Sequence, residues 1–397
     1  MSHFSMYMRR LNMPSKTQYP PLSYALIGCG RVSVKHLKAV LKKKSGLTLT
    51  AIVDSNPAAP ANLLRAAGLS KSAAAKLLST VHIYTDFEEM LAGEKPEIVA
   101  ITVPSGLHFR IAKACLQSGA HILLEKPMTM RSSEARQLYE LSESTGKKVA
   151  MGHIYRYFPM VGNLRKDIAA GVFGTLSHGS VIVRWGHDQA YYDQAAWRGT
   201  WKSDGGALMN QTVHALDLLC WLMNGTAVSA NAMLARRTHD MEAEDVALGM
   251  LTLDNHTLCQ VEGTTSTSIH DHEASFFING TKGTLRVGLR RGKPFFDIRD
   301  AAGHRKNLYY LRKDIREKGL PGLLSLLNPH AGIYRDLVDA IHENRNPIAD
   351  AKSGYTAVDM VLALYQSAKE KKEISLPLTT DFSSEEMTGF FPPSSDK

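Results

Sequence analysis

The chain has 397 residues, more than the roughly 250 at which a single hydrophobic core stops growing, so we expect two domains. Hydrophobic residues make up 44% and charged residues 21%, and no apolar run approaches the ~20 residues of a transmembrane helix, which excludes an integral membrane protein. The net charge is +9 and its basic excess falls within residues 286–318, which lack a nucleic-acid recognition motif, so nucleic acid is not expected as a partner.

Both ends of the chain are predicted to be unpacked. Residues 1–20 are basic and lack the apolar core of a secretory signal, so they are interpreted as a disordered leader. Residues 377–397 form a tail that is rich in Ser, Pro and Glu after about Asp381.

The four cysteines have no metal-ligand spacing and do not suggest a disulfide framework; they are Cys29, Cys115, Cys220 and Cys259. We interpret them as reduced thiols, and we expect a cytoplasmic protein without a metal site.

Residues 21–151 alternate short β-rich runs with helical stretches. Such alternation predicts a doubly wound parallel sheet, that is, an α/β Rossmann domain. Strands are expected at residues 24–27, 49–53, 98–103 and 121–124. Their apolar residues are continuous, which is typical of strands that helices cover on both faces.

The first expected strand ends at the turn Gly28-Cys29-Gly30-Arg31-Val32-Ser33, and a helix should follow to Lys44. The two glycines permit a tight turn and the approach of a pyrophosphate, which the N–H groups at a helix start can bind. Asp54 ends the second strand, where a carboxylate would bind the adenosine ribose and repel a 2′-phosphate. Because Ser55 and not an arginine follows it, NAD is favoured over NADP. The alternative is a plain strand-end turn.

Two further strand ends should face the same crevice. Thr102, Pro104 and Ser105 follow one strand and are candidate cofactor contacts, as is His108 at the next helix start, which is equally compatible with no chemical role. Glu125-Lys126-Pro127 follows residues 121–124. An ammonium there would have a lowered pKa and would bind a substrate hydroxyl. The alternative is a lysine that points into water.

Residues 152–376 have a different texture, with longer strands in succession separated by Gly, Asn and Asp turns. The strands are expected at residues 176–185, 246–253, 258–264, 274–278 and 284–287, and helices at residues 213–223, 332–342 and 354–371. This pattern predicts an α+β domain with a large, open, mostly antiparallel sheet.

A glycine-rich entry leads into the helix of this second domain. After Gly205 and Gly206, the side chains of Asn210, His214 and Asp217 are spaced i, i+4 and i+7, so they share one helix face. An amide, an imidazole and a carboxylate on one face are unusual for a core helix. The alternative is that His214 is an internally satisfied core histidine.

Taken together, residues 28–44, Glu125-Lys126-Pro127 and residues 205–217 resemble the Gfo/Idh/MocA oxidoreductase family, and the resemblance covers about residues 23–376. It implies NAD as the cofactor, with Glu125 and Lys126 beside it, Lys126 between nicotinamide and substrate, and His214 in proton transfer. Many members have aspartate four positions before this histidine. Here it is Asn210, whose amide can orient a substrate but cannot take a proton.

Residues 191–201 look like the branch of this family that acts on nucleotide sugars, such as UDP-N-acetylglucosaminuronate 3-dehydrogenases of surface-polysaccharide synthesis. The likeness implies that Trp197 and Arg198 approach the cofactor, and that Tyr155, Arg156 and Trp201 contact the substrate. Aromatic faces suit stacking on a sugar, and a guanidinium suits a phosphate or carboxylate. For Trp201 the alternative is a hydrophobic anchor.

The resulting hypothesis is an NAD-dependent dehydrogenase that oxidises a hydroxyl of an anionic sugar, a nucleotide-linked amino sugar or uronic acid. The hydroxyl would give its proton to His214 while Lys126 binds the same oxygen. A homodimer or homotetramer is implied by the resemblance alone. Two alternatives stay open: an NAD-dependent glycoside hydrolase of the same family, and an NAD-binding regulator without turnover.

Overall fold

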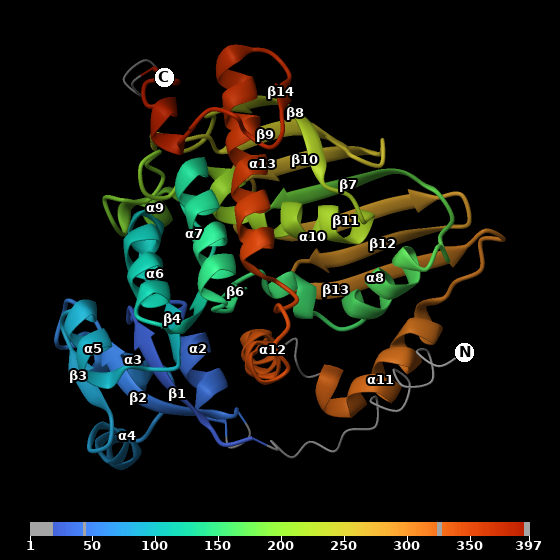
Figure 1. Ribbon diagram of the computed structural model, residues 1–397. Coiled ribbons are helices and arrows are strands. Elements are labelled where there is room, and N and C mark those ends of the chain that lie inside the picture. The colour runs from blue at the N-terminus through green and yellow to red at the C-terminus, as the bar shows by residue number, and fades with distance from the viewer. Residues whose placement is uncertain (1–18, 43–44, 324–327, 393–397) are drawn as a thin grey trace.

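The computed structural model describes residues 19–42, 45–323 and 328–392. The chain is organised around two sheets, the first drawn in blue to teal in Figure 1 and the second in green to orange. Of the expected basic leader, residues 1–18 lie outside the described residues. Among the helices that the structure describes, none is long and apolar enough to span a membrane.

The first sheet has six parallel strands in the order β3-β2-β1-β4-β5-β6. They are β1 (Leu22–Ile27), β2 (Leu47–Val53), β3 (His82–Tyr84), β4 (Ile98–Ile101), β5 (His121–Leu124) and β6 (Val149–Met151). The expected Rossmann sheet is therefore confirmed. The strand order reverses between β1 and β4, and ligands of such sheets bind outside the carboxyl ends of the strands at this point.

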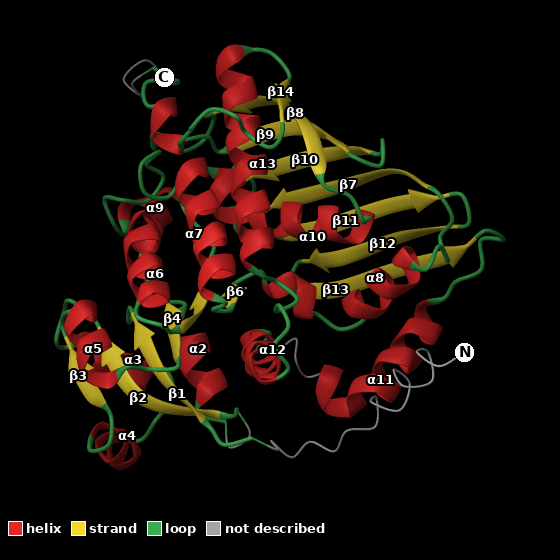
Figure 2. Cartoon of the chain, in the orientation of Figure 1, coloured by secondary structure: helices red, strands yellow, loops and turns green. Residues whose placement is uncertain are grey.

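Helices cover both faces of this sheet, as Figure 2 shows. They are α2 (Ser33–Val40), α3 (Ala59–Ala66), α4 (Lys71–Leu78), α5 (Phe87–Glu94), α6 (His108–Gln117) and α7 (Ser132–Thr145). Alternate residues of β1 enter opposite clusters of the core: Ala25 and Ile27 on one side, Tyr24 and Leu26 on the other. Helix α2 ends at Val40, earlier than the expected Lys44.

The second sheet has eight strands in the order β13-β12-β11-β7-β10-β9-β8-β14, and only the β7–β10 pair is parallel. They are β7 (Leu176–Arg184), β8 (Ala227–Ala235), β9 (Val246–Leu253), β10 (Leu258–Thr264), β11 (Glu273–Gly280), β12 (Gly283–Arg290), β13 (Lys293–Asp300) and β14 (Ile374–Ser375). The expected open, mostly antiparallel sheet is confirmed.

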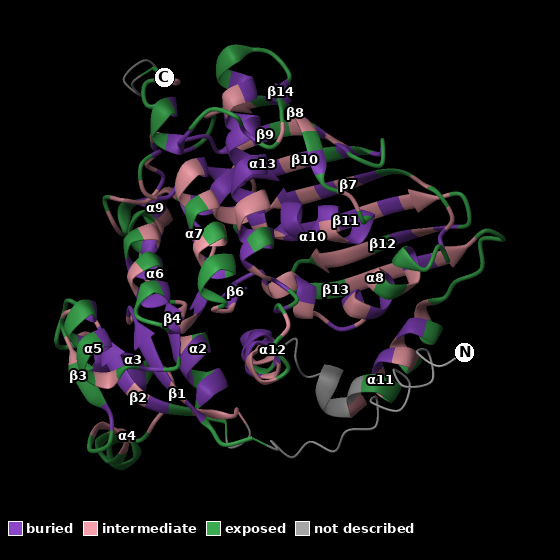
Figure 3. Ribbon diagram, in the orientation of Figure 1, coloured by how far each residue is buried: buried purple, intermediate pink, exposed green. Residues whose placement is uncertain are grey.

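One face of the second sheet is covered by helices that run across it in Figure 1. The covering helices are α10 (Val213–Met223) and α13 (Ala351–Glu370), both buried along most of their length in Figure 3. Further helices are α8 (Val161–Ala169), α9 (Gln189–Asp193) and α11 (Asn307–Leu323). The other face exposes apolar side chains, among them Met233, Leu248 and Met250. The basic excess of residues 286–318 is partly paired with carboxylates, as in Arg290–Glu273 and Lys306–Asp300.

One helix that the sequence places among those of the second domain packs elsewhere, and the expectation of an unpacked tail is wrong for its described part. Helix α12 (His330–His342) packs on the Rossmann sheet, because its Ile333 and Leu337 join the core cluster around β1. The chain after Asp381 is packed as far as it is described: Phe382 and Met387 are buried, and a short 3-10 turn forms at Ser384–Met387. Apolar residues scattered among polar ones in the tail supply enough burial to order it.

Candidate active site

The glycine turn after β1 is held rigidly by three strands. Gly28 has φ +94°, and a Cβ on it would lie 2.9 Å from the carbonyl carbon and oxygen of Thr102. The Cys29 N–H donates to the Asp54 carboxylate at 2.7 Å, and the Ser33 hydroxyl donates to the Gly30 carbonyl at 2.5 Å. Only glycine fits at position 28, because the backbone is left-handed and the β4 end is in contact.

The turn fits a bound dinucleotide. Gly30 and Arg31 are exposed at its tip, next to the half-buried Val32, and no side chain caps the N-terminus of α2, so its N–H groups are available to a pyrophosphate. The Asp54 carboxylate accepts only the Cys29 and Asn56 N–H groups and keeps lone pairs for ribose hydroxyls, with Ser55 exposed beside it. Bound NAD would therefore lie on backbone groups and one carboxylate.

The loop after β4 supports the turn with buried side chains. The Thr102 hydroxyl donates to the Gly28 carbonyl at 2.7 Å, so it fixes the backbone of the turn. Pro104 is exposed and Ser105 half-buried, which leaves both reachable by a cofactor.

The expectation that His108 touches the cofactor is wrong. Its imidazole is 1% exposed, with Nδ1 at 2.7 Å from the Pro127 carbonyl and Nε2 at 3.0 Å from the Val103 carbonyl. Burial lowers the pKa of His108. Its role is to join the loops that follow β4 and β5.

Lys126 lies at the carboxyl end of β5 and points across to the second domain. Its ammonium donates to the backbone carbonyl of Asn210 and, at 3.2 Å, to the side-chain carbonyl of the same residue. Burial lowers the pKa of Lys126, while the charges of Glu125 and Asp204 act in the opposite sense. The alternative of a lysine that points into water is excluded, and an amine with a lowered pKa can exchange a proton more readily.

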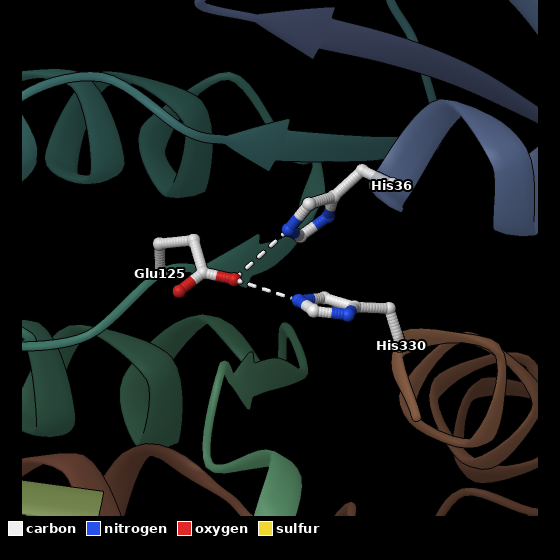
Figure 4. A group of neighbouring side chains, drawn as sticks. All are labelled: His36, Glu125 and His330. Atoms are coloured by element: carbon white, nitrogen blue, oxygen red, sulfur yellow. Dashed lines mark hydrogen bonds and ion pairs between the residues drawn. The ribbon is translucent and has the colours of Figure 1, made fainter. Parts of the chain in front are cut away.

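Glu125 serves packing and not the cofactor, contrary to expectation. It is 7% exposed; its Oε1 lies 2.9 Å from His36 Nε2 and 3.4 Å from His330 Nε2, and its Oε2 accepts the Lys126 N–H at 3.2 Å. Figure 4 shows both imidazoles directed at this one oxygen. Burial raises the pKa of Glu125, but the two histidines outweigh burial and hold it well below its usual range.

These three ligand-type side chains lie close enough together to hold a metal ion. Their contacts are also those of a hydrogen-bonded network, because His36 Nδ1 lies 2.8 Å from the Tyr334 hydroxyl, which meets the Tyr24 hydroxyl at 2.7 Å. The network joins β1, α2, β5 and α12, and so fastens α12 to the Rossmann domain beneath Lys126.

His214 is the second expected catalytic residue, and it stands in an aromatic, largely dry environment. Its ring is 5.5 Å from that of Tyr155 and 5.9 Å from that of His153, and its buried Nδ1 has no hydrogen-bond partner. Burial, followed by the charge of Lys126, holds the pKa of His214 well below its usual range. This shift favours the uncharged form of the imidazole, the form that can accept a proton.

The helix that carries His214 does not present one continuous face. Residues Ala207–Thr212 form a π-helix that precedes α10, so Asn210 lies on a wider turn than an α-helix would give. Asn210 faces Lys126, but Asp217 faces Arg156, whose Nε and Nη2 donate to its two oxygens at 2.8 and 2.6 Å. The expected single face is therefore split between two partners.

Arg156 is engaged within the protein, and its expected substrate contact stays a prediction. Its Nη1 donates to the Ile348 carbonyl at 2.6 Å, and its guanidinium lies 4.9 Å from the Trp221 ring centre. A cavity of about 310 Å³ borders Arg156 and Asp217, and neither Lys126 nor His214 lines it.

The aromatic segment at residues 191–201 contains one residue that only packs, Trp201, and one that lies between two aromatic rings, Arg198. Trp201 is fully buried and packs against Tyr365 and Phe391, so the alternative of a hydrophobic anchor is correct and a substrate contact is not. Arg198 lies between Tyr191 and Trp197, 4.4 and 4.7 Å from their ring centres. Its buried Nε has no hydrogen-bond partner among the described residues.

Two side chains of this site, Asp204 and His187, were not predicted from the sequence. Asp204 is 4% exposed, accepts the Gly199 N–H at 2.9 Å, and also accepts the Asn210 side-chain amide. His187 stacks on Tyr191 with ring centres 3.7 Å apart, and Arg31 of the glycine turn acts on the pKa of both. The position of Asp204 directly before Gly205-Gly206 was the one available signal.

Comparison with known proteins adds to this geometry. The chain matches the oxidoreductase family profile GFO_IDH_MocA, an NAD-binding Rossmann fold, over residues 22–153, and the GFO/IDH/MocA C-terminal domain over residues 161–286. It is similar to the WlbA dehydrogenase from Bordetella pertussis, solved with NADH and UDP-GlcNAcA, with a TM-score of 0.78 and 28% identity over 91% of this chain and 100% of that one.

Two curated relatives are similar as well. The scyllo-inositol 2-dehydrogenase (NADP(+)) of Bacillus subtilis is 26% identical over 309 residues, 73% of this chain and 82% of the relative. The D-glucoside 3-dehydrogenase of Escherichia coli is 23% identical over 388 residues, 92% of this chain and 100% of the relative.

Proposed function

The chain belongs to the GFO/IDH/MocA family of NAD-binding oxidoreductases, and on that premise we propose that it oxidises a hydroxyl group of a sugar with NAD as the acceptor. The observation that carries this proposal is the Lys126 ammonium at the carboxyl end of β5, which is bonded to Asn210, one helical turn before His214, and whose charge acts on the pKa of His214. Bound NAD supplies the hydride acceptor; the chain supplies binding, orientation and proton transfer.

Lys126 and His214 divide the work on the substrate hydroxyl. The imidazole of His214, whose pKa is lowered by burial, accepts the hydroxyl proton, and the Lys126 ammonium hydrogen-bonds the same oxygen and stabilises its developing charge. Asn210 holds the lysine in place from the second domain. General base assistance of this kind contributes ~10²- to 10⁴-fold to the rate.

We propose a nucleotide-linked amino sugar or uronic acid as the substrate. Support comes from the likeness to an enzyme solved with UDP-GlcNAcA, and from the guanidinium of Arg198 between Tyr191 and Trp197, a group that suits a phosphate or carboxylate. The equally complete match to a D-glucoside 3-dehydrogenase makes a simple glucoside the second candidate.

The test is to incubate the protein with NAD and a panel of UDP-GlcNAcA, UDP-glucuronate, UDP-GlcNAc, methyl glucoside and myo-inositol, following NADH absorbance. Fastest oxidation of an anionic nucleotide sugar is expected. Activity confined to methyl glucoside or inositol would overturn the nucleotide-sugar assignment, and cleavage of a glycoside without net NADH would favour a hydrolase.

The role of Lys126 is tested in the same assay with Lys126→Met, which should lower turnover by ~10³-fold while NADH still binds. Lys113→Met, on the exposed side of α6, is the matched control and should retain wild-type turnover. Unchanged turnover of Lys126→Met would sink the assignment.

We also propose that the protein is a homodimer or homotetramer. The uncovered face of the second sheet, with Met233, Leu248 and Met250 exposed, supports association between copies. Light scattering should give a mass of two or four chains; a monomer would contradict this.

A further inference from the structure

We propose that Asp204 is a positioning residue that holds the Lys126 ammonium at the end of β5 by way of the Asn210 side-chain amide. The inference rests on the proposed role of Lys126 and adds to it a carboxylate from the loop before the π-helix. No hydrogen bond joins Asp204 directly to Lys126, so its hydrogen-bonded hold on the ammonium runs through Asn210, while its charge also acts on the lysine across space.

The connection is a chain of two hydrogen bonds. Lys126 Nζ donates to the Asn210 side-chain oxygen at 3.2 Å, and the Asn210 side-chain nitrogen donates to Asp204 Oδ1. The second carboxylate oxygen accepts the Gly199 N–H at 2.9 Å. Both oxygens of Asp204 are therefore held, and the carboxylate has one orientation.

This chain can run in one direction only. An ammonium has donors and no acceptor, and a carboxylate has acceptors and no donor, so the amide oxygen must face Lys126 and the amide nitrogen must face Asp204. Asn210 thus transmits the position of a buried anion to a half-buried cation. A residue at 210 without both a donor and an acceptor would break the connection.

Two carboxylates, Glu125 and Asp204, act on the charge of Lys126. Of these two, Asp204 has no hydrogen bond to a basic side chain among the described residues. Glu125 adjoins the lysine in sequence, but His36 and His330 both approach its Oε1. The further titratable groups that act on or respond to the charge of Lys126 are the imidazoles of His108, His153 and His214, from α6, the loop after β6 and α10. Arg198 acts on Asp204 from the other side.

The consequence is a measurable property of Lys126 itself. Burial lowers the pKa of the lysine, and the charge of Asp204 opposes that shift. Removing the Asp204 carboxylate should therefore lower the pKa of Lys126 further. Placing a carboxylate at position 210 instead should raise the pKa of Lys126 again.

The experiment measures Lys126 directly, without any substrate. The full-length protein is trace-labelled with acetic anhydride between pH 6 and pH 11, and the labelled fraction of Lys126 is compared by mass spectrometry with that of exposed Lys38. In Asp204→Asn the apparent pKa of Lys126 should fall by about 1. In the double variant Asp204→Asn/Asn210→Asp it should return toward the wild-type value.

Two further variants keep the result decisive. Asn210→Ala leaves the carboxylate in place but breaks the connection, so it should lower the pKa of Lys126 even if Asp204→Asn folds poorly. Asp245→Asn removes another buried carboxylate, which accepts the N–H groups of residues 237–239, and should lower stability without moving the pKa of Lys126.

An unchanged pKa of Lys126 in both Asp204→Asn and Asn210→Ala overturns the inference, and so does a shift of equal size in Asp245→Asn. The outcome is independent of the proposed function. A pKa shift in a protein that oxidises no sugar would leave the positioning role intact, whereas sugar oxidation without the shift would remove it.

Discussion

The glycine turn at residues 28–33 and the segment at residues 204–217 both lead from glycines into a helix, yet they are built in different ways. The first is fixed by its own backbone, with Gly28 against Thr102 and the Cys29 N–H on Asp54. The second depends on side chains that arrive from far away in the chain, Lys126 and Arg156 among them. A ligand bound by backbone leaves a pattern in the sequence, whereas a set of side chains from separate elements leaves little more than residue types.

The largest expected effect lies in the second region. His214→Ala should lower turnover by ~10²- to 10⁴-fold, because the group that accepts the substrate proton is lost. NADH affinity, measured by fluorescence titration, should stay near wild type. His178→Ala, an exposed histidine of β7, is the control. If NADH affinity falls as far as turnover does, the two regions are not separable.

A second test asks whether Arg156 is structural. Arg156→Met leaves Asp217 buried without its partner, which should lower the free energy of unfolding by about 3 to 5 kcal/mol, measured with urea. Adding Asp217→Leu should recover part of the loss. A raised KM at unchanged stability would instead make Arg156 a substrate contact.

The two glycines of the turn allow a sharper test of the first region. Gly28→Ala should lower stability by about 1 to 3 kcal/mol and weaken NADH binding, because its Cβ would meet the backbone of Thr102 in a left-handed conformation. Gly30→Ala is the matched control: its Cβ would lie 3.9 Å from the Thr102 carbonyl oxygen, an ordinary contact, so it should fold normally and lose NADH affinity alone. Equal Tm values for the two variants would argue against a rigid turn.

The smallest effect concerns the hydrogen-bonded network around His36, which joins β1, α2 and β5 to α12. Burial lowers the pKa of His36 in the folded state, so below its unfolded pKa of about 6.5 the unfolded chain binds more protons. Stability should therefore fall as the pH falls from about 6.5 to 5, by up to about 1.4 kcal/mol per pH unit for this histidine. Urea unfolding at pH 7 and 5.5 measures this, and His36→Asn should flatten the dependence; an equal slope in both proteins would contradict it.

Much of the fold and part of the site could be predicted from the sequence. The Rossmann sheet, the open antiparallel sheet and the bounds of α10 follow from local patterns of apolar residues, which reflect burial along each element. Glycine at 28 and the carboxylate at 54 are equally local requirements, because they belong to one strand-turn-helix unit and the strand beside it.

Only the tertiary structure decided which polar side chains face the crevice. Four residues that were predicted as functional from the sequence are engaged in packing or internal hydrogen bonds: Glu125, His108, Arg156 and Trp201. Asp204 was not predicted as a site residue, yet it accepts a hydrogen bond from the side-chain amide of Asn210, which binds Lys126. The physical reason is that a motif specifies the local course of the backbone. The partner of a side chain depends instead on elements far away in the sequence, as Asn210 lies more than 80 residues from Lys126.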